Sequence, residues 1–324
     1  MNSYPLVSIL INNYNYDRFI SQAIDSALNQ TYPNVEVIVV DDGSTDNSLD
    51  VIRNYRDRIT PVVKNNGGQA SALNAGFSIC KGEIICLLDA DDLFLPERIL
   101  EVIRLFKLSA TTDWIFTEST PIETECLCDD NLDLIYKNVL DKKSKDLPRE
   151  VDFREDMKNG RLPNFTPSTS NLCFSRRLLE RIFPLPEIKG FSGMAITDLY
   201  MKLLAVGLGT GYVTVQNLGI FRIHNNLYST LDISKKRRMF GETYTTTGYW
   251  MKINFPEFPK ISTKIISKGY ATYAKSDYLK DESSDADCEK MISHYLSKAT
   301  VLERLKAYFM ISYYSLKLSF QDFV

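Results

Sequence analysis

The chain has 324 residues, of which 44% are hydrophobic and 24% charged, as is usual for a water-soluble globular protein with one large domain or two modest ones. Its 38 basic and 41 acidic side chains give a formal net charge of −3, so the bulk charge offers no argument for a nucleic-acid partner. No apolar run is long enough to span a bilayer, and no signal-peptide pattern opens the sequence.

The first third of the chain alternates between two kinds of pattern. Short runs rich in β-branched residues predict strands at 6–11, 35–40, 59–64, 83–89 and 113–118. Between them, apolar residues recur at helical spacing, as in 19–28 and in the helix expected to start at Pro96. Strands that alternate with helices predict right-handed crossovers and a largely parallel central sheet flanked by helices, an α/β fold.

The rest of the chain is less regular. Residues 119–162 are charged and predict a surface excursion with a helix near 131–140. A strand ending near Ser175 and a helix at 176–182 follow, and then a glycine-bounded loop leads into a helix within 190–209. Strands are expected at 211–215 and 218–224, and helices from about 234. We therefore expect a domain over 1–232 and a helical C-terminal extension over 233–324.

Polar residues follow several of the predicted strands. They are Asn12 to Asn15, Asp41 with Asp42, and Asp89 to Asp92. Because ligands of parallel α/β sheets bind beyond the carboxyl ends of the strands, these clusters favour one shared site over separate solvated turns. Carboxylates suit Mg²⁺ or Mn²⁺. Asp92 has a second interpretation, as the cap of the helix that follows.

Three stretches resemble the family 2 glycosyltransferases. They are VSILINNYNYDRFISQAIDSALNQTYPNVEVIVVDDGSTDNS (7–48), NNGGQASALNAGF (65–77) and EIICLLDADDLFLPERI (83–99). The resemblance implies the GT-A fold, with a nucleotide-binding half over about 5–118 and an acceptor half over about 163–231. It also implies a nucleotide-sugar donor, a divalent metal ion, and inversion at the anomeric carbon.

The resemblance assigns roles to residues of the first half. Asp89-Ala-Asp91 matches the D-x-D motif, in which Asp91 holds the metal ion and Asp89 faces the ribose or bound water. Asp42 matches the carboxylate that accepts the ring N–H of the base. The remaining donor-site candidates are Asn12 and Tyr14 around the base, and Gly68 and Asn74 in the loop beside the donor. Tyr14 could instead pack at a strand edge, and Asn74 could be a helix-surface amide.

The second half should supply a general base. Asp198 matches an acidic pair of the family, although the residue before it is Thr197 where Glu is common. Its alternative role is a helix N-terminal carboxylate, and Glu187 is the second choice of base. His224 matches a residue near the diphosphate or metal, or it is a core histidine, while Arg222 is expected to face solvent.

The resemblance therefore implies a glycosyltransferase with Mg²⁺ or Mn²⁺ as cofactor. Its expected substrates are a sugar carried by UDP and a hydroxyl of a glycan or lipid-linked glycan, in cell-surface polysaccharide synthesis. The alternative is a non-catalytic nucleotide-sugar-binding or assembly subunit. A nucleotidyltransferase or dinucleotide-binding enzyme is disfavoured, because no glycine-rich phosphate loop follows the first strand.

Cellular location follows from the cysteines and the C-terminal helices. The six cysteines show no paired metal motif and fit a reducing cytoplasm. Residues 302–320 mix apolar and basic side chains, so they either pack on the catalytic domain or lie on the inner face of a membrane.

Overall fold

A computed structural model describes residues 4–141, 146–163, 167–188, 192–224, 232–276 and 287–321. The chain divides into two compact units. Unit 1 comprises Met1–Asp152, Phe165–Leu185 and Leu208–Asn225, and unit 2 comprises Phe153–Asn164, Pro186–Gly207 and Asn226–Val324.

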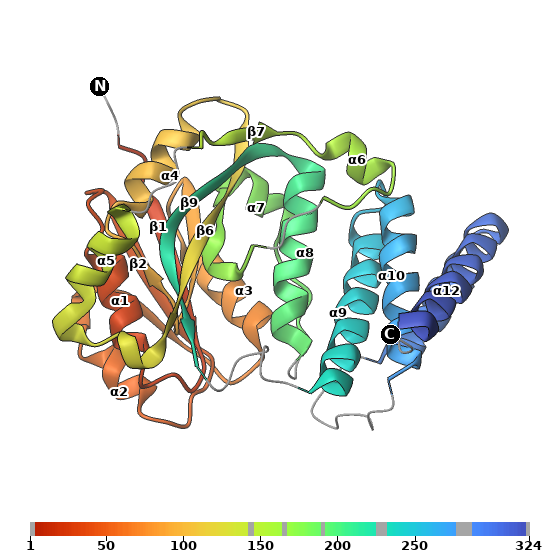
Figure 1. The fold of residues 1–324 in the computed structure, drawn as a ribbon, viewed down its shortest axis with the longest axis horizontal. Coiled ribbons are helices and arrows are strands. Elements are labelled where there is room, and N and C mark those ends of the chain that lie inside the picture. Colours follow the sequence, from red (N-terminus) through yellow and green to blue (C-terminus); the bar gives the residue numbers. More distant parts are fainter. Residues whose placement is uncertain are drawn as a thin grey trace. The chain divides into compact units, whose positions relative to one another are not determined.

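Unit 1 is built on a sheet that has nine strands among the described residues (Figure 1). Its order is β3-β2-β1-β4-β8-β6-β9-β5, and β7 also pairs with β9. The strands are β1 (Val7–Asn13), β2 (Val35–Asp41), β3 (Thr60–Val63), β4 (Ile84–Asp89), β5 (Leu93–Phe94), β6 (Thr112–Glu123), β7 (Arg149–Val151), β8 (Leu172–Ser175) and β9 (Thr210–Ile223).

The first four strands in sheet order are parallel, as the alternating sequence pattern predicts. Helices α1 (Ile20–Leu28), α2 (Ser48–Arg53) and α3 (Gln69–Ile79) connect them in turn. Strands β1 and β4 are almost completely buried, because helices cover parallel strands on both faces, and this explains their continuous apolar sequence. Unit 1 also contains α4 (Arg98–Phe106), α5 (Leu132–Asp141), α7 (Arg176–Ile182) and the 3-10 turns η1 (Arg56–Arg58), η2 (Thr124–Cys126), η3 (Asp129–Asn131) and η4 (Thr169–Asn171).

The other half of the sheet is mixed and departs from the sequence prediction in several places. Strand β8 runs antiparallel to both β4 and β6, whereas β6 and β9 are parallel. Residues 119–123, predicted as part of a surface excursion, extend β6, and 149–151 form β7. The two strands predicted at 211–215 and 218–224 form one strand, β9. Its polar residues Gln216 and Asn217 stay within the strand, next to register shifts in the pairing of β9 with β6.

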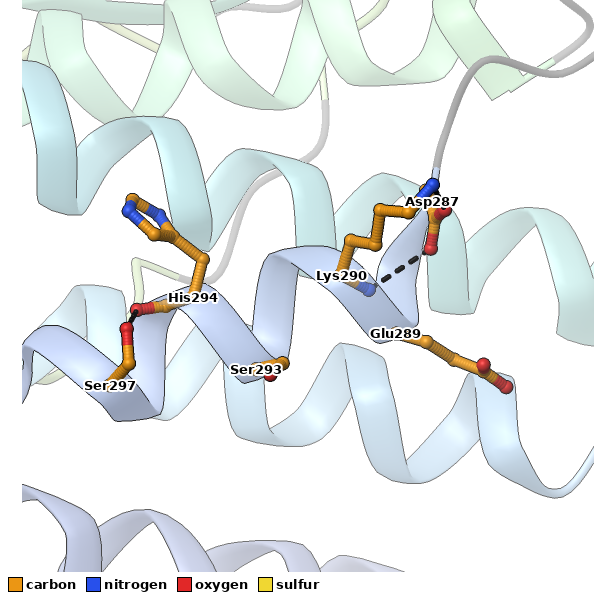
Figure 2. A pocket seen from close by; sticks show the side chains of 6 residues that line it. All are labelled: Asp287, Glu289, Lys290, Ser293, His294 and Ser297. Carbon is orange, nitrogen blue, oxygen red and sulfur yellow. Dashed lines mark hydrogen bonds and ion pairs between the residues drawn. The ribbon is translucent and has the colours of Figure 1, made fainter.

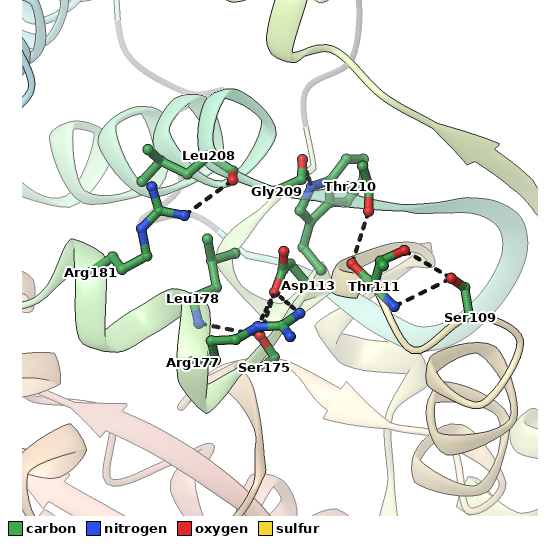
Figure 3. Close-up of polar contacts among 11 residues, drawn as sticks. Ser109, Thr111, Asp113, Ser175, Arg177, Leu178, Arg181, Leu208, Gly209 and Thr210 are labelled. Atoms are coloured by element: carbon green, nitrogen blue, oxygen red, sulfur yellow. Dashed lines mark hydrogen bonds and ion pairs between the residues drawn. The ribbon is translucent and has the colours of Figure 1, made fainter. Parts of the chain in front are cut away.

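Polar contacts hold this mixed half together near the amino end of β4 (Figure 3). Asp113 of β6 accepts hydrogen bonds from Ser175 (3.0 Å) and from Arg177 of α7 (2.6 Å). The Ser175 hydroxyl also accepts from the Leu178 N–H and so caps α7. Thr210 donates to the Thr111 carbonyl at 2.9 Å, which fixes the start of β9 against β6.

Unit 2 is helical in its described residues. Its helices are α6 (Arg154–Lys158), α8 (Ser192–Leu208), α9 (Ile233–Asn254), α10 (Pro259–Ala274), α11 (Cys288–Lys298) and α12 (Val301–Gln321). Helices α9 and α10 lie side by side (Figure 1). They approach closely at Gly248, where a Cβ atom would lie only 2.5 Å from the Ile266 nitrogen. The helical pattern predicted from about residue 234 is thus present. In the described part of the chain, no helix has the length and apolar character that crossing a membrane requires.

Candidate active site

The predicted site lies at the carboxyl edge of the parallel strands. Asn12 of β1 pairs in register with Asp89, the last residue of β4, and Asn13 pairs with Asp41, the last residue of β2. The polar clusters that follow β1, β2 and β4 therefore share one edge of the sheet, as predicted from the sequence. Residues from α3, η4 and β9 join them.

Asp91 and His224 form the central pair of this edge. Asp91 Oδ2 lies 3.0 Å from His224 Nε2, and both side chains are largely buried. The His224 ring packs beside Phe19 and Tyr16, with ring centroids 5.2 and 5.8 Å away. Burial raises the pKa of the Tyr16 hydroxyl above its ordinary value, and the charges of Asp91 and Asp89 and a hydrogen bond to Asp91 raise it further. Tyr16 therefore stays a neutral hydrogen-bond donor beside the carboxylates.

Asp92 does not cap the next helix, which was its alternative role. Helix α4 begins at Arg98 after Glu97 as N-cap, and the Asp92 carboxylate accepts the backbone N–H of Arg222 at 3.1 Å instead. Burial raises the pKa of Asp92 to about 8, with a further contribution from the charge of Asp91. Asp92 is thus mostly protonated at neutral pH, which reduces the repulsion among the three clustered carboxyl groups.

Arg222 is buried, so the expectation that it faces solvent is wrong. Its guanidinium donates to the Asp91 carbonyl at 2.8 Å and to Gln22 Oε1 of α1 at 2.6 Å, and it lies 4.6 Å from the centre of the Phe19 ring. The side chain thereby joins β9, the D-x-D loop and α1. Although the Arg222 side chain is charged, these contacts are all with groups of the protein, which indicates a structural role.

Asp89 is held from two sides. The side-chain amide of Gln69 of α3 donates to Asp89 Oδ1 at 3.1 Å, and the backbone N–H of Asp89 donates to the Ser170 hydroxyl at 3.1 Å. The turn that carries Ser170, η4, is fixed by the buried Arg98, which donates to the Ser170 carbonyl at 2.6 Å. The predicted D-x-D segment is therefore positioned by residues that come from α3, η4 and α4.

Asp42 anchors the glycine loop. Its carboxylate accepts from Lys64 Nζ at 2.6 Å, from the Gly67 N–H at 3.0 Å and from the Gly68 N–H at 2.7 Å. Gly68 has a φ of 85°, a left-handed conformation that favours glycine, and it is the N-cap of α3. These three donors leave about one of the four acceptor positions of the Asp42 carboxylate for the ring N–H of a base.

The remaining donor-site candidates differ in their surroundings. Tyr14 is 45% exposed, so its ring face is open to a ligand. Asn74 bridges α3 to the segment after α7, because its amide accepts from the Leu185 N–H at 2.7 Å and donates to the Leu185 carbonyl at 2.9 Å. The Oδ1 atom of Asn12 and the Oε1 atom of Gln69 are buried without a hydrogen-bond partner. Such acceptors are costly unless a ligand donates to them.

The proposed bases belong to unit 2. Asp198 is half-buried on α8, one turn before Lys202, and Glu187 is exposed ahead of that helix. Burial lowers the pKa of Lys202, and the negative charge of Asp198 opposes that shift. The two residues therefore interact electrostatically along α8, and the catalytic role of Asp198 stays a prediction.

The Asp91–His224 pair fits a divalent ion that is completed by other ligands. Among the described residues, no three His, Cys, Asp or Glu side chains form a metal cage. Neighbouring ligands of an octahedral Mg²⁺ are about 3 Å apart when its bonds are about 2.1 Å, and the two pair atoms are 3.0 Å apart. Because Mg²⁺ commonly takes one or two protein ligands together with phosphates and water, two ligands suffice.

A depression of about 430 Å³ lies elsewhere, on unit 2 (Figure 2). Its lining residues are Asp287, Glu289, Lys290, Ser293, His294 and Ser297. Lys290 pairs with Asp287 at 2.8 Å, and Ser297 donates to the His294 carbonyl at 2.8 Å. The lining comes from α11 and its cap alone, in contrast with the sheet edge, where several elements contribute.

Comparison with known proteins tests the predicted family resemblance. The model described as Glycosyl transferase family 2 matches residues 8–117. These residues form a family 2 glycosyltransferase segment. The predicted resemblance is confirmed, and this segment contains most of β1, all of β2 to β4 and all three aspartates of the D-x-D loop.

Two curated relatives extend the comparison. The chain is 33% identical over 228 residues to an uncharacterized glycosyltransferase, alr2836, of Nostoc sp., covering 67% of this chain and 65% of the relative. It is 39% identical over 128 residues to the hyaluronan synthase of Pasteurella multocida, covering 39% of this chain and 13% of the relative. The chain thus spans less than two thirds of the length of either relative. The first relative is named as a glycosyltransferase, in agreement with the predicted class.

The fold agrees with that family. The crystal structure of S. aureus TarS 1–349 in complex with UDP-GlcNAc matches with a TM-score of 0.57 at 16% identity, over 93% of this chain and 78% of that chain. At this identity the match concerns the fold alone. The predicted GT-A type α/β fold with a helical C-terminal part is confirmed.

Sequence reasoning missed several residues of the site. Tyr16, Gln69, Ser170 and Arg222 all contact the D-x-D aspartates or their backbone. Tyr16 and Gln69 lie within the quoted family stretches, so their position was a usable signal. Ser170 and Arg222 reach the site only through the pairing of β8 and β9 with the rest of the sheet, which no local pattern encodes.

Proposed function

We propose that the chain is an inverting, metal-dependent glycosyltransferase, which moves a sugar from a UDP-sugar to a hydroxyl of a glycan or lipid-linked glycan. The observation that carries the proposal is the Asp91–His224 pair, 3.0 Å apart, at the carboxyl edge of a family 2 segment. The unsatisfied acceptors of Asn12 and Gln69 support a ligand at the same edge.

Different residues of the chain have different roles in the proposed reaction. Asp91 and His224 would hold a Mg²⁺ or Mn²⁺ ion, which when bound neutralises the departing diphosphate. Asp89 faces the ribose or bound water, Asp42 accepts the ring N–H of the base, and the exposed ring of Tyr14 stacks on the base. Asp198 takes the proton of the acceptor hydroxyl while that oxygen bonds to the anomeric carbon and the bond to the diphosphate breaks.

Similar proteins support the nucleotide and the product class. TarS 1–349 was solved with UDP-GlcNAc, which favours a UDP-sugar as donor. Hyaluronan synthase and chondroitin synthase of P. multocida are 39% and 40% identical to this chain over 128 and 124 residues, which favours synthesis of a cell-surface polysaccharide.

The reducing cytoplasm is the proposed compartment. All six cysteines are free thiols, and Cys80, Cys86, Cys173 and Cys288 are buried. A disulfide therefore does not contribute to the stability of this fold, which suits a cytoplasmic protein.

A donor screen tests the proposed function. The purified chain is incubated with UDP-, GDP-, CDP- and dTDP-sugars and a panel of glycan acceptors, and release of nucleoside diphosphate is measured with Mn²⁺, with Mg²⁺ or with EDTA. We expect release from UDP-sugars only, and only with a metal ion. Release that EDTA leaves unchanged contradicts the metal site. Metal-dependent nucleotide binding without release from any donor favours the binding subunit.

A further inference from the structure

Helix α12 is apolar on two opposite sides. On its inner side, Ala307 is fully buried and Ile311 packs on a cluster with Ile266, Ile292 and Tyr295. On its outer side, Leu302, Leu305, Phe309, Tyr313 and Leu316 are between 53% and 73% exposed. A helix that covers a bundle normally presents polar side chains to water, so the outer side requires an explanation.

The five outer residues form one continuous face, called here the outer face of α12. They are spaced three or four residues apart, and this spacing places them on the same side of a helix. Val301 and Tyr308 adjoin this face and are 74% and 55% exposed. The strip includes two large aromatic rings and three leucines, a larger apolar area than single exposed side chains produce.

The helix is held firmly in unit 2, so the outer face is not a frayed end. Thr300 and Glu303 form reciprocal hydrogen bonds at its start, the Thr300 N–H donating to Glu303 at 2.9 Å and the Glu303 N–H to the Thr300 hydroxyl at 3.3 Å. Glu303 also pairs with Lys252 of α9 at 2.6 Å. These contacts and the inner packing fix which side of α12 faces outward.

The charges beside the outer face are basic. Lys306 and Lys317 are exposed and lie four residues after Leu302 and Tyr313, along one border of the face. Glu303 is the only acidic residue of 301–321, and Lys252 neutralises it. Lys317 also lies close enough to Lys268 of α10 for its charge to lower the pKa of Lys268, after the larger effect of burial.

We propose that the outer face of α12 binds the surface of an anionic lipid bilayer. Leucine and aromatic side chains enter the boundary between headgroups and acyl chains, and Lys306 and Lys317 contact the lipid phosphates at its border. This partner complements both the apolar face and its basic border. A second copy of the chain fits less well, because its own outer face would cover the apolar strip but offers no acidic side chain to pair with Lys306 and Lys317. This inference concerns unit 2 and does not depend on the proposed transfer reaction.

Vesicle sedimentation tests this inference on the full chain. The protein is mixed with vesicles of phosphatidylcholine alone, or of phosphatidylcholine with 30% phosphatidylglycerol, at low and high salt. We expect binding to the anionic vesicles, weakened by salt, and little binding to the neutral ones. The double variant Leu305→Ser with Phe309→Ser should lower the partition coefficient at least tenfold. Lys306→Gln and Lys317→Gln, which leave the apolar face intact, should each lower it about fivefold.

Matched controls and a solution measurement decide the outcome. Leu100→Ser and Leu134→Ser replace exposed leucines of α4 and α5 in unit 1 and should bind vesicles like the wild type. Equal binding by the wild type and the Leu305/Phe309 variant overturns the inference. So does absence of binding to anionic vesicles. Light scattering that shows a wild-type oligomer, dissociated by Phe309→Ser, assigns the face to a second copy instead.

Discussion

Three carboxyl groups occupy neighbouring positions in the D-x-D loop, and each has a different environment. Asp89 accepts from Gln69, Asp91 faces His224, and Asp92 is buried against the Arg222 backbone. Burial raises the pKa of Asp92 to about 8, so Asp92 is mostly neutral at pH 7. The sequence predicted different roles for the three aspartates, and the fold replaces the predicted helix-cap role of Asp92 with a buried contact to the Arg222 backbone.

Replacement of Asp42 by alanine should weaken nucleotide binding. If Asp42 accepts the ring N–H of the base, the variant loses a charge-assisted hydrogen bond of roughly 1.5–3 kcal/mol, and the Kd for UDP rises about tenfold or more. Calorimetry with UDP and Mn²⁺ measures this.

Lys64→Met is the matched control, because it removes the ion pair with Asp42 but keeps the carboxylate and its contacts to Gly67 and Gly68. We expect its Kd to stay near that of the wild type. Unchanged affinity in Asp42→Ala, or equal losses in both variants, would show that Asp42 serves only the loop.

Local patterns predicted some elements well and others poorly. Strands β1, β2 and β4 are continuous apolar runs, because helices cover both of their faces, so their sequences identify them. Strands β5 and β7, with two and three residues, are too short for any periodicity and were not predicted. The edge position of Asn12, Asp42 and Asp89 followed from strand ends, whereas Ser170 and Arg222 depend on long-range strand pairing.

At the level of the helix, Glu303 should stabilise α12. The Lys252 ammonium and the Thr300 N–H hold the pKa of Glu303 at about 2, below its ordinary value. The stabilisation is therefore complete above about pH 4.5 and is lost as the pH falls toward 2. Because the side chains of Glu303 and Lys252 are partly exposed, we expect Glu303→Gln to lower the free energy of unfolding by about 1–2 kcal/mol at pH 7.

Urea denaturation at several pH values checks this prediction. The difference between wild type and Glu303→Gln should be constant from pH 5 to pH 7 and should shrink between about pH 4.5 and pH 2.5. A double-mutant cycle with Lys252→Met should give a coupling energy of about 0.5–1 kcal/mol. A difference independent of pH throughout would refute the role assigned to the Glu303 carboxylate.

At the scale of the whole molecule, the residues proposed for donor binding and for proton transfer belong to different units. Unit 1 contains the donor-site candidates, while Asp198 belongs to unit 2. If Asp198 is the base, Asp198→Asn keeps nucleotide affinity near the wild-type value, because the base acts on the acceptor. Turnover should then fall about 10²–10⁴-fold, the usual contribution of general-base catalysis. Steady-state kinetics and UDP calorimetry on the same preparation separate the two effects.

Glu187→Gln is the comparison for this variant. We expect it to retain turnover if Asp198 is the base. Full turnover in Asp198→Asn would exclude Asp198 and favour Glu187, and a loss confined to donor affinity would assign Asp198 to the donor site.

The most direct measurement is the metal dependence of UDP binding in the wild type and in Asp91→Asn. We expect UDP to bind the wild type at least tenfold more tightly with Mn²⁺ than with EDTA, because Asp91 and His224 hold the ion that contacts the diphosphate. In Asp91→Asn the two affinities should be nearly equal, while Asp50→Asn, an exposed carboxylate of α2, should behave like the wild type. An Asp91→Asn variant that keeps the full effect of Mn²⁺ would contradict the assignment of the metal site.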